Sequence, residues 1–430
     1  MSSNTIYRMA TANQYDNTRQ NLLKRQHTLS GLHENITSGK RVIKASDDPV
    51  AAAQAERAIT RLSRVQTEQR ALEAQRNSIA QAETTLGDAI DVMQAIRDEV
   101  VSAGRGALTD ADRKTIANQI QSLRDQLTEI ANRKDTNGVP LLGALGSALT
   151  PFLGSLGSSS TYQFNGLAGQ AASVGVTVPL TLDGHSAFMF DPQRDGVYAA
   201  TLTGATGTPS MTTTGITATD LSQVTGDEYA IVFSGVGPGA TAGTSTATYT
   251  IQNLTQGTSS APVTVPDFPN DKPLDLTITD VPGLSFSIKA SANLKADGSI
   301  AYSPANGDTI NLKPSASIFN TIDSVVQGLT ISGDANAATQ AVTQALTNLD
   351  KGMERLSNMR GYAGELLNRV DRITSDQENR SIQLESDRSR AEDLDMIKGI
   401  SDYQNANTAY EAALQSYAQI QRLSLFNYIS

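Results

Sequence analysis

The stretch LEAQRNSIAQAETTLGDAIDVMQAIRDEV, residues 72–100, places an apolar side chain at every seventh position. Such a repeat keeps one face of a helix against a partner, as in a coiled coil. The sequence therefore predicts one long helix from Pro49 to about Gly104, roughly 80 Å at 1.5 Å per residue. Its apolar seam consists of Leu72, Ile79, Leu86, Met93 and Val100, with Ala82, Ala89, Ile96 and Ala103 at the second position of each repeat.

A matching apolar repeat occurs in the last hundred residues. It consists of Val342, Leu349, Leu356, Ala363 and Val370, with Ala345, Met359, Leu366 and Ile373 beside them. From Thr374 to Arg390 the repeat turns polar, so pairing there is expected to be looser or to rely on charge. Two narrow apolar seams are most simply covered by each other, so the two ends of the chain are predicted to pack as one antiparallel bundle.

The middle of the chain has a different composition. Residues 150–315 are rich in Gly, Ser, Thr, Val and Pro, and an Asp297-Gly298 pair marks a hairpin turn. Apolar residues there alternate with small or polar ones, which is the period of a half-buried strand. These alternating segments are Val174–Val178, Tyr229–Phe233, Leu274–Ile278 and Leu284–Ile288.

The predicted fold class is α+β and multidomain, with N- and C-terminal helices paired in a coiled-coil-like rod bundle and an antiparallel β-rich middle domain inserted between them. Three parts are predicted: a terminal helical assembly domain from 1–38 plus 393–430, an α-helical rod domain from 39–148 plus 316–392, and a β-rich outer domain, possibly of two subdomains, from 149–315.

Local signals predict where the helices begin and end. Thr109 and Asp112 have the spacing of a capping box in front of a further helix. Gly39 can end the first helix in the left-handed conformation, while Asp48 and Pro49 suit the N-cap and first turn of the next. Asp47 is expected to meet Lys40, Arg41 or water. The predicted inter-domain connector is Ser38, Gly39, Lys40, Arg41, Asp47, Asp48 and Pro49.

The outermost forty or so residues at each end carry small apolar stripes that one partner helix cannot cover well. A short two-helix unit is marginal in water. We therefore expect these tips to be mobile in the free monomer and to become ordered when neighbouring subunits cover them. Tyr403, Tyr410 and Tyr417 form a tyrosine row near the C-terminus. In a soluble monomer this row would be part of an ordinary core; here a subunit interface is favoured. The predicted assembly interface is Leu22, Leu29, Leu32, Ile36, Tyr403, Tyr410, Tyr417, Ile420, Leu423, Leu425 and Phe426.

Composition argues against several other classes of protein. The chain lacks cysteine, so disulfides, thiolate metal sites and cysteine nucleophiles are excluded. A net charge of −10 without a sustained basic block argues against nucleic-acid binding. Its three histidines, His27, His33 and His185, lack the spacing of a zinc site. No signal peptide, membrane-inserting segment, catalytic residue or cofactor site is predicted.

Several stretches at both ends of the chain share their pattern with one family. They are Thr5–Arg8, Ser38–Val42, Ser46–Pro49, Leu108–Arg113, Leu123–Leu127, Ala409–Gln415 and Leu423–Phe426, joined in the middle by Ser303–Asp308 and Ile318–Ile322. These stretches resemble the flagellin superfamily, in particular the subfamily that joins the flagellar hook to the filament. One departure is Leu141–Gly146, where the family usually has an aromatic-rich turn.

The resemblance implies a structural subunit of the bacterial flagellum, located outside the cell, and no enzymatic activity. It implies a ring of copies of the chain, with hook-associated protein 1 on the hook side and flagellin on the filament side. It also implies export through the flagellar type III channel without a cleaved signal, and a cytosolic export chaperone at the C-terminal helix. Two alternatives stay open: a flagellin of the filament itself, or a glycan-binding or enzymatic β-domain.

Overall fold

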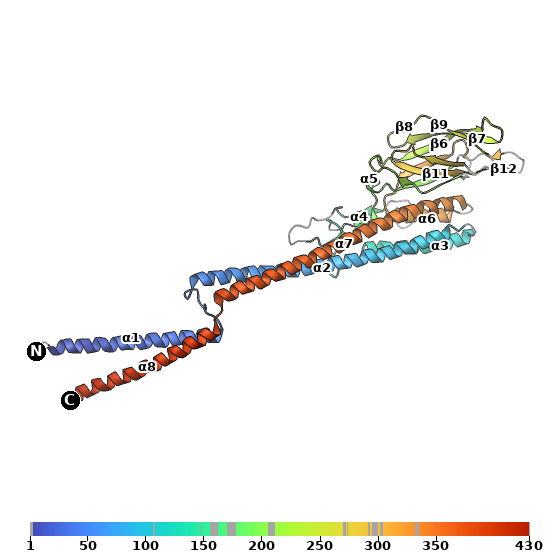
Figure 1. Ribbon diagram of the computed structural model, residues 1–430. Helices are drawn as coiled ribbons and strands as arrows, with labels where there is room; N and C mark the ends of the chain where they lie inside the picture. The colour runs from blue at the N-terminus through green and yellow to red at the C-terminus, as the bar shows by residue number, and fades with distance from the viewer. Residues whose placement is uncertain are drawn as a thin grey trace. The chain divides into compact units, whose positions relative to one another are not determined.

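The computed structural model describes residues 3–105, 108–146, 148–154, 162–169, 178–204, 211–269, 272, 274–290, 293–294, 300–301, 304–331 and 335–429. The helices are α1 (Ser3–Ser38), α2 (Pro49–Ala103), α3 (Asp110–Ala131), α4 (Gly184–Phe188), α5 (Pro192–Asp195), α6 (Ile318–Thr330), α7 (Ala335–Glu392) and α8 (Met396–Ile429) (Figure 1).

The strands lie in the middle of the chain, as predicted. They are β1 (Phe152–Leu153), β2 (Gln163–Phe164), β3 (Tyr198–Thr203), β4 (Met211–Thr213), β5 (Thr217–Ala218), β6 (Tyr229–Pro238), β7 (Thr244–Asn253), β8 (Thr258–Ser259), β9 (Val263–Pro269), β10 (Leu274–Ile278), β11 (Leu284–Ala290), β12 (Asn293–Leu294), β13 (Ile300–Ala301) and β14 (Thr309–Pro314). Val174–Val176 and Asp297-Gly298 lie outside the described residues.

The chain divides into two compact units. The end unit comprises residues 1–71 and 372–430, and the central unit comprises residues 72–371. Helices α2 and α7 contribute residues to both units. The three-part division predicted from the sequence differs from these boundaries and stays a prediction.

The predicted apolar seam forms the helical core of the central unit. Leu72, Ile79, Leu86, Met93 and Val100 of α2 are all buried, and so are Val342, Leu349, Leu356, Ala363 and Val370 of α7. Ion pairs link the two helices in antiparallel register. Arg76 meets Asp371 at 3.2 Å, and Arg97 meets Asp350 at 2.8 Å. The antiparallel pairing predicted from the two repeats is therefore confirmed.

Helix α3 begins with the capping box that the sequence predicted. The Thr109 hydroxyl accepts the Asp112 N–H at 3.2 Å, and the Asp112 carboxylate accepts the Thr109 N–H at 3.0 Å. These bonds satisfy two of the donors that a helix N-terminus leaves unpaired. The Arg124 side chain of α3, 3% exposed, lies 3.2 Å from the Asp323 carboxylate of α6, so a buried ion pair joins these two helices.

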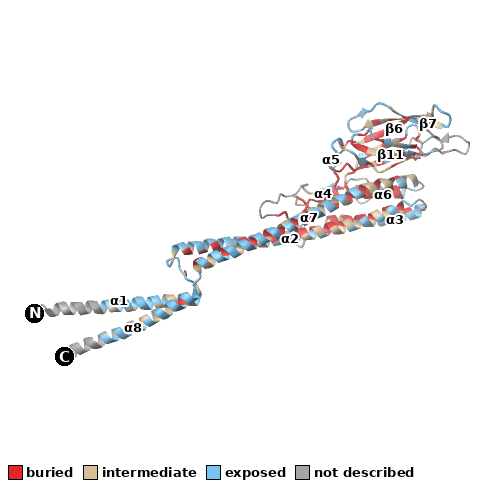
Figure 2. Ribbon diagram, in the orientation of Figure 1, coloured by how far each residue is buried: buried red, intermediate tan, exposed pale blue. Residues whose placement is uncertain are grey.

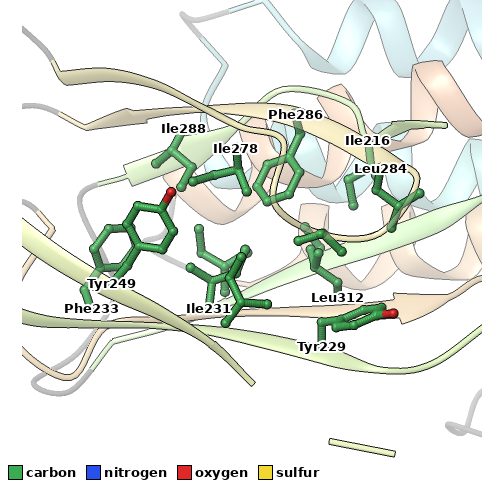
Figure 3. Close-up of a cluster of buried hydrophobic side chains, with 14 of the residues drawn as sticks. Ile216, Tyr229, Ile231, Phe233, Tyr249, Ile278, Leu284, Phe286, Ile288 and Leu312 are labelled. Carbon is green, nitrogen blue, oxygen red and sulfur yellow. The ribbon is translucent and has the colours of Figure 1, made fainter. Parts of the chain in front are cut away.

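Ten of the described strands form an antiparallel sandwich, and β1-β2 and β12-β13 form two separate two-stranded sheets. One sheet has the order β3-β14-β6-β7-β8, with β9 also pairing with β7; the other has the order β10-β11-β4, with β5 also pairing with β11. The side chains that fill the space between the two sheets include the alternating residues predicted in Tyr229–Phe233, Leu274–Ile278 and Leu284–Ile288, whereas Val178 lies outside a strand and outside this core (Figure 3). Those labelled in the figure include Tyr229, Ile231, Phe233 and Tyr249 from one sheet and Ile278, Leu284, Phe286 and Ile288 from the other.

A row of amide side chains attaches the sandwich to α7. Asn336, Gln340, Gln344 and Asn348 recur every four residues, so they share one face of the helix. The Asn336 amide donates to the Met211 carbonyl at 2.7 Å, and the Gln340 amide oxygen accepts the Thr213 N–H at 2.7 Å. The Gln344 amide donates to the Thr214 carbonyl at 2.6 Å, and the Asn348 amide donates to the Tyr198 carbonyl at 3.1 Å. The row therefore satisfies backbone groups of the sandwich that would otherwise be buried without partners.

In the end unit, α2 and α7 continue the seven-residue spacing with smaller and more polar side chains. Its buried seam residues are Ala51, Ala58 and Val65 of α2 and Gln377, Leu384 and Ala391 of α7. The buried seam of α7 therefore continues through residues 374–390, and one of its positions, Gln377, is polar. Gln377 is 4% exposed, and both polar atoms of its amide lack a hydrogen-bond partner.

Candidate assembly interface

Helices α1 and α8, from opposite ends of the sequence, lie side by side in the end unit (Figure 1). The rings of His33 on α1 and Tyr403 on α8 are 5.9 Å apart between centroids. This contact joins positions 370 residues apart along the chain. The prediction that the two ends of the chain pair with each other is thereby confirmed for the outermost helices.

The predicted interface residues lie along this helix pair and are only half-buried. Intermediate burial is found for Leu22, Leu29, Leu32, Ile36, Tyr403, Tyr410 and Tyr417. No side chain within residues 16–38 or 400–419 is fully buried, and Figure 2 shows the pair in the colours of exposed and intermediate residues. Ile420, Leu423, Leu425 and Phe426 belong to the last turns of α8, but their side chains lie outside the described part of the chain.

Other apolar side chains of the pair face solvent outright. Leu23 of α1 is 54% exposed, and on α8 Ile397 is 86% exposed, Ile400 44% and Leu414 42%. Each helix of the pair therefore covers part of its partner and leaves further apolar surface uncovered. Removing such surface from water is favourable by about 25 cal/mol per Å². The pair can thus gain free energy from any further helices that pack on it.

The predicted connector forms a backbone link between the end of α1 and the end of α7. Gly39 has φ +71°, the left-handed value that suits glycine after a helix. The Gly39 carbonyl accepts the Leu394 N–H at 2.9 Å, and the Arg41 N–H donates to the Glu392 carbonyl at 2.7 Å. Lys40 and Asp393 form an antiparallel bridge between these bonds. Backbone hydrogen bonds therefore hold the segment that follows α1 against the segment that follows α7.

Side chains of the connector strengthen this link. Lys40 forms an ion pair with Glu392. The Arg41 guanidinium donates to the Ala391 carbonyl at 2.9 Å, close to the C-terminus of α7, where a positive charge is favourable. Ala391, Glu392 and Asp393 also belong to the connector, and the sequence did not indicate them because nothing local in 38–49 points to a partner about 350 residues away.

The two aspartates of the connector are both caps. The Asp48 carboxylate accepts the Ala51 N–H at 3.0 Å and the Val50 N–H at 3.2 Å, and it meets Arg41 at 3.2 Å. The predicted N-cap role of Asp48 is therefore confirmed. Lys40 and Arg41 were wrong as predicted partners of Asp47: its carboxylate accepts the Lys44 N–H at 2.9 Å and the Ile43 N–H at 3.2 Å. For Asp47, backbone donors three and four residues away compete better than mobile lysine or arginine side chains.

These contacts lower the pKa of both carboxyl groups. The Ala51 N–H, followed by the Arg41 guanidinium, holds the pKa of Asp48 below 3.8. The Lys44 N–H does the same for the pKa of Asp47. Both side chains are therefore charged at neutral pH, and their role is to shape the chain between α1 and α2.

The described residues contain no group of three or more His, Cys, Asp or Glu placed to hold a metal ion. None of the described helices combines the length and apolar character needed to cross a membrane.

Two family models match the helical ends of the chain. The bacterial flagellin N-terminal helical region matches residues 9–145, and the bacterial flagellin C-terminal helical region matches residues 339–429. Together they cover more than half of the 430 residues. The segment between the two matches contains all the strands found in the described residues.

Individual proteins agree with these matches. The chain is similar to the flagellar hook-associated protein 3 of Salmonella typhimurium, with 31% identity over 147 residues that make up 34% of this chain and 46% of the relative. The chain thus spans about half the length of this curated relative.

Two solved structures share the fold. The hook associated protein-3 from Legionella pneumophila matches with a TM-score of 0.59 and 21% identity, over 77% of this chain and 97% of that one. The FlgL protein from Xanthomonas campestris matches with a TM-score of 0.55 and 22% identity, over 77% of this chain and 98% of that one. Paired terminal helices with an inserted β domain are therefore an arrangement that these proteins have in common.

Proposed function

Because this chain belongs to the flagellin family, we propose that it is a structural subunit of the bacterial flagellum that forms the junction between hook and filament. The observation that carries the proposal is the α1/α8 pair, whose apolar row is half-buried along its whole described length. A monomer gains little from such a pair, whereas an assembly in which copies cover one another gains from every one of them. The role is one of assembly, without catalysis.

The proposed mechanism is coupled ordering and burial. Leu22, Leu29, Leu32 and Ile36 of α1 and the tyrosine row of α8 would nest against the same helices of neighbouring copies. Each newly covered side chain contributes about 25 cal/mol per Å² of apolar surface, reduced by the entropy lost when the tips become ordered. Ile420, Leu423, Leu425 and Phe426 would extend this interface to the end of α8.

The partners follow from the position proposed for the chain. Copies of the chain would form a short ring, with hook-associated protein 1 on the hook side and flagellin on the filament side. Export through the flagellar type III channel would need the tips unfolded in transit, which suits a helix pair with few buried side chains. A cytosolic chaperone would cover α8 before export.

The proposal is tested by deleting the gene for this chain in its own bacterium and examining the flagella by electron microscopy. We expect hooks without filaments, with unassembled flagellin in the medium, and recovery when the wild-type gene is returned. Normal filaments on the deletion strain would contradict the junction role. A protein that extends filament seeds when purified would instead be a flagellin.

A pair of variants tests the interface itself. Tyr410→Asp places a charge in the half-buried row of α8 and should block incorporation while leaving the central unit folded. Gln404→Asp introduces the same charge at an exposed position of the same helix and should incorporate normally. Normal incorporation of Tyr410→Asp would remove the tyrosine row from the interface.

A further inference from the structure

Charge is divided unevenly between the two units. Residues 72–371 contain 17 Lys and Arg against 29 Asp and Glu, whereas residues 1–71 with 372–430 contain 17 against 15. The net charge of −10 therefore comes entirely from the central unit, and the end unit is slightly positive. Copies of one chain with this asymmetry attract each other when the end unit of one copy meets the central unit of another.

Three arginines of the end unit line a groove between α2 and α7. This groove, of about 400 Å³, is lined by Gln54, Arg57, Ala58, Arg61, Leu384, Asp387, Arg390 and Ala391. The Arg390 guanidinium is neutralised within the groove by the Asp387 carboxylate at 2.8 Å. Arg57 and Arg61 are exposed, and no carboxylate of the described residues forms an ion pair with either. They lie one helical turn apart, about 6 Å along the axis.

The central unit has a counterpart on its own stretch of α2. Asp91 and Asp98 are exposed, lie seven residues apart and form no ion pair with a described cation. The arginines nearest in the sequence and across the seam already have carboxylate partners: Arg97 meets Asp350 at 2.8 Å, and Arg360 meets Glu83 at 2.6 Å. Arg360 and Arg97 are close enough to feel the charges of Asp91 and Asp98, but they are already paired elsewhere. Two negative charges about 10 Å apart on one face of a helix therefore lack a direct ion-pair partner among the described residues.

We infer that the Arg57/Arg61 groove of one copy receives the Asp91/Asp98 face of α2 of a second copy. This inference rests on the proposed assembly function and adds a second contact, distinct from the α1/α8 pair. Exposed ion pairs add little affinity each, but opposite charges select the partner and its orientation, and like charges exclude wrong pairings. The α1/α8 pair would supply the apolar burial, and the groove would set the register between neighbouring copies.

The absence of cysteine from the chain allows a direct test by cross-linking. Gln54 lines the groove, and Gln94 is an exposed residue between Asp91 and Asp98. A chain carrying both Gln54→Cys and Gln94→Cys is introduced into the deletion strain, and isolated flagella are oxidised and run on a denaturing gel. We expect covalent dimers and higher ladders from the double variant and none from either single variant. Incorporation without any cross-linked product overturns the inference.

Charge reversal gives a second measurement that does not depend on cysteine geometry. The variant Arg57→Glu/Arg61→Glu should lower the number of filament-bearing hooks by about tenfold or more, because the groove then repels Asp91 and Asp98. Its matched control, Arg64→Glu/Arg70→Glu, makes the same change in net charge at exposed residues of α2 outside the groove and should behave as wild type.

Adding Asp91→Lys/Asp98→Lys to the reversed groove should restore the filaments at least in part, since the two surfaces attract again. Equal loss in the groove variant and its control, or no recovery in the combined variant, overturns the inference. Failure of the wild-type gene to restore filaments would instead contradict the proposed function, so the two failures are distinguishable.

Discussion

Two helical regions of this chain have similar sequence patterns and different degrees of burial. In the central unit, seam residues such as Leu86 and Met93 are completely buried. In the end unit, Leu29, Leu32 and the tyrosines of α8 repeat at helical spacing as well, yet each is half-exposed. The difference lies in the number of neighbours. In the central unit α6 also reaches the seam, since Ile318 and Met93 both lie against Gly352, whereas the main neighbour of α1 among the described elements is α8. Periodicity therefore predicts a helix face, and coverage decides whether that face is a core or an interface.

The largest effect is expected from truncating the central seam. Leu86→Ala should lower the free energy of unfolding of the free monomer by about 3 kcal/mol, because it leaves a cavity at a fully buried position. Leu32→Ala removes the same atoms from the half-buried α1 and should cost less than about 1 kcal/mol. Urea unfolding monitored by circular dichroism measures both. Equal losses would mean that the two regions are covered alike in the monomer.

The next largest loss of stability is expected from a substitution in the amide row of α7. Asn348→Leu deprives the buried Tyr198 carbonyl of its donor and should destabilise the central unit by about 2 kcal/mol. Asn358→Leu, at an exposed position of the same helix, should change stability by less than about 0.5 kcal/mol. If both variants unfold at the same urea concentration, the row contributes nothing to the attachment of the sandwich.

A gain in stability is expected at the polar member of the seam. Gln377 is buried without partners for its amide, so Gln377→Leu should raise the free energy of unfolding by about 1 kcal/mol. Gln383→Leu on the exposed face of α7 serves as the control. The Gln377→Leu variant would give the end unit a continuous apolar seam, like that of the central unit. A loss of stability in Gln377→Leu would show that the amide is satisfied in solution.

The connector predicts a small dependence of stability on pH. The pKa of Asp48 is lowered in the folded chain, chiefly by the Ala51 N–H, so its contribution is present above about pH 4 and is lost as the pH falls through the folded value. Asp47 acts in the same direction. Between pH 5 and pH 2 the melting temperature should fall less in Asp48→Asn than in the wild type. Parallel melting curves over this range would rule out the cap as a source of acid sensitivity.

The sequence predicts most of the helices and the sandwich core because their signals are local. The heptads of α2 and α7, the Thr109–Asp112 box, Gly39 and the Asp48 cap each depend on residues within a few turns of one another. The partners of the connector and the amide row could not be predicted, because Glu392 and Tyr198 reach their positions only through the tertiary fold. The seam at Gln377 and Leu384 was missed because a polar residue interrupts the apolar repeat.

Helices α1 and α8 are incompletely covered in one copy, and in the proposed assembly other copies cover them. Amide hydrogen exchange followed by mass spectrometry measures this directly in free monomer and in isolated flagella. We predict exchange within seconds to minutes for residues 16–38 and 400–419 of the monomer, slow exchange at Leu72–Val100, and strong protection of all three segments after assembly. Protection of the terminal helices in the monomer equal to that of the central seam would contradict the account.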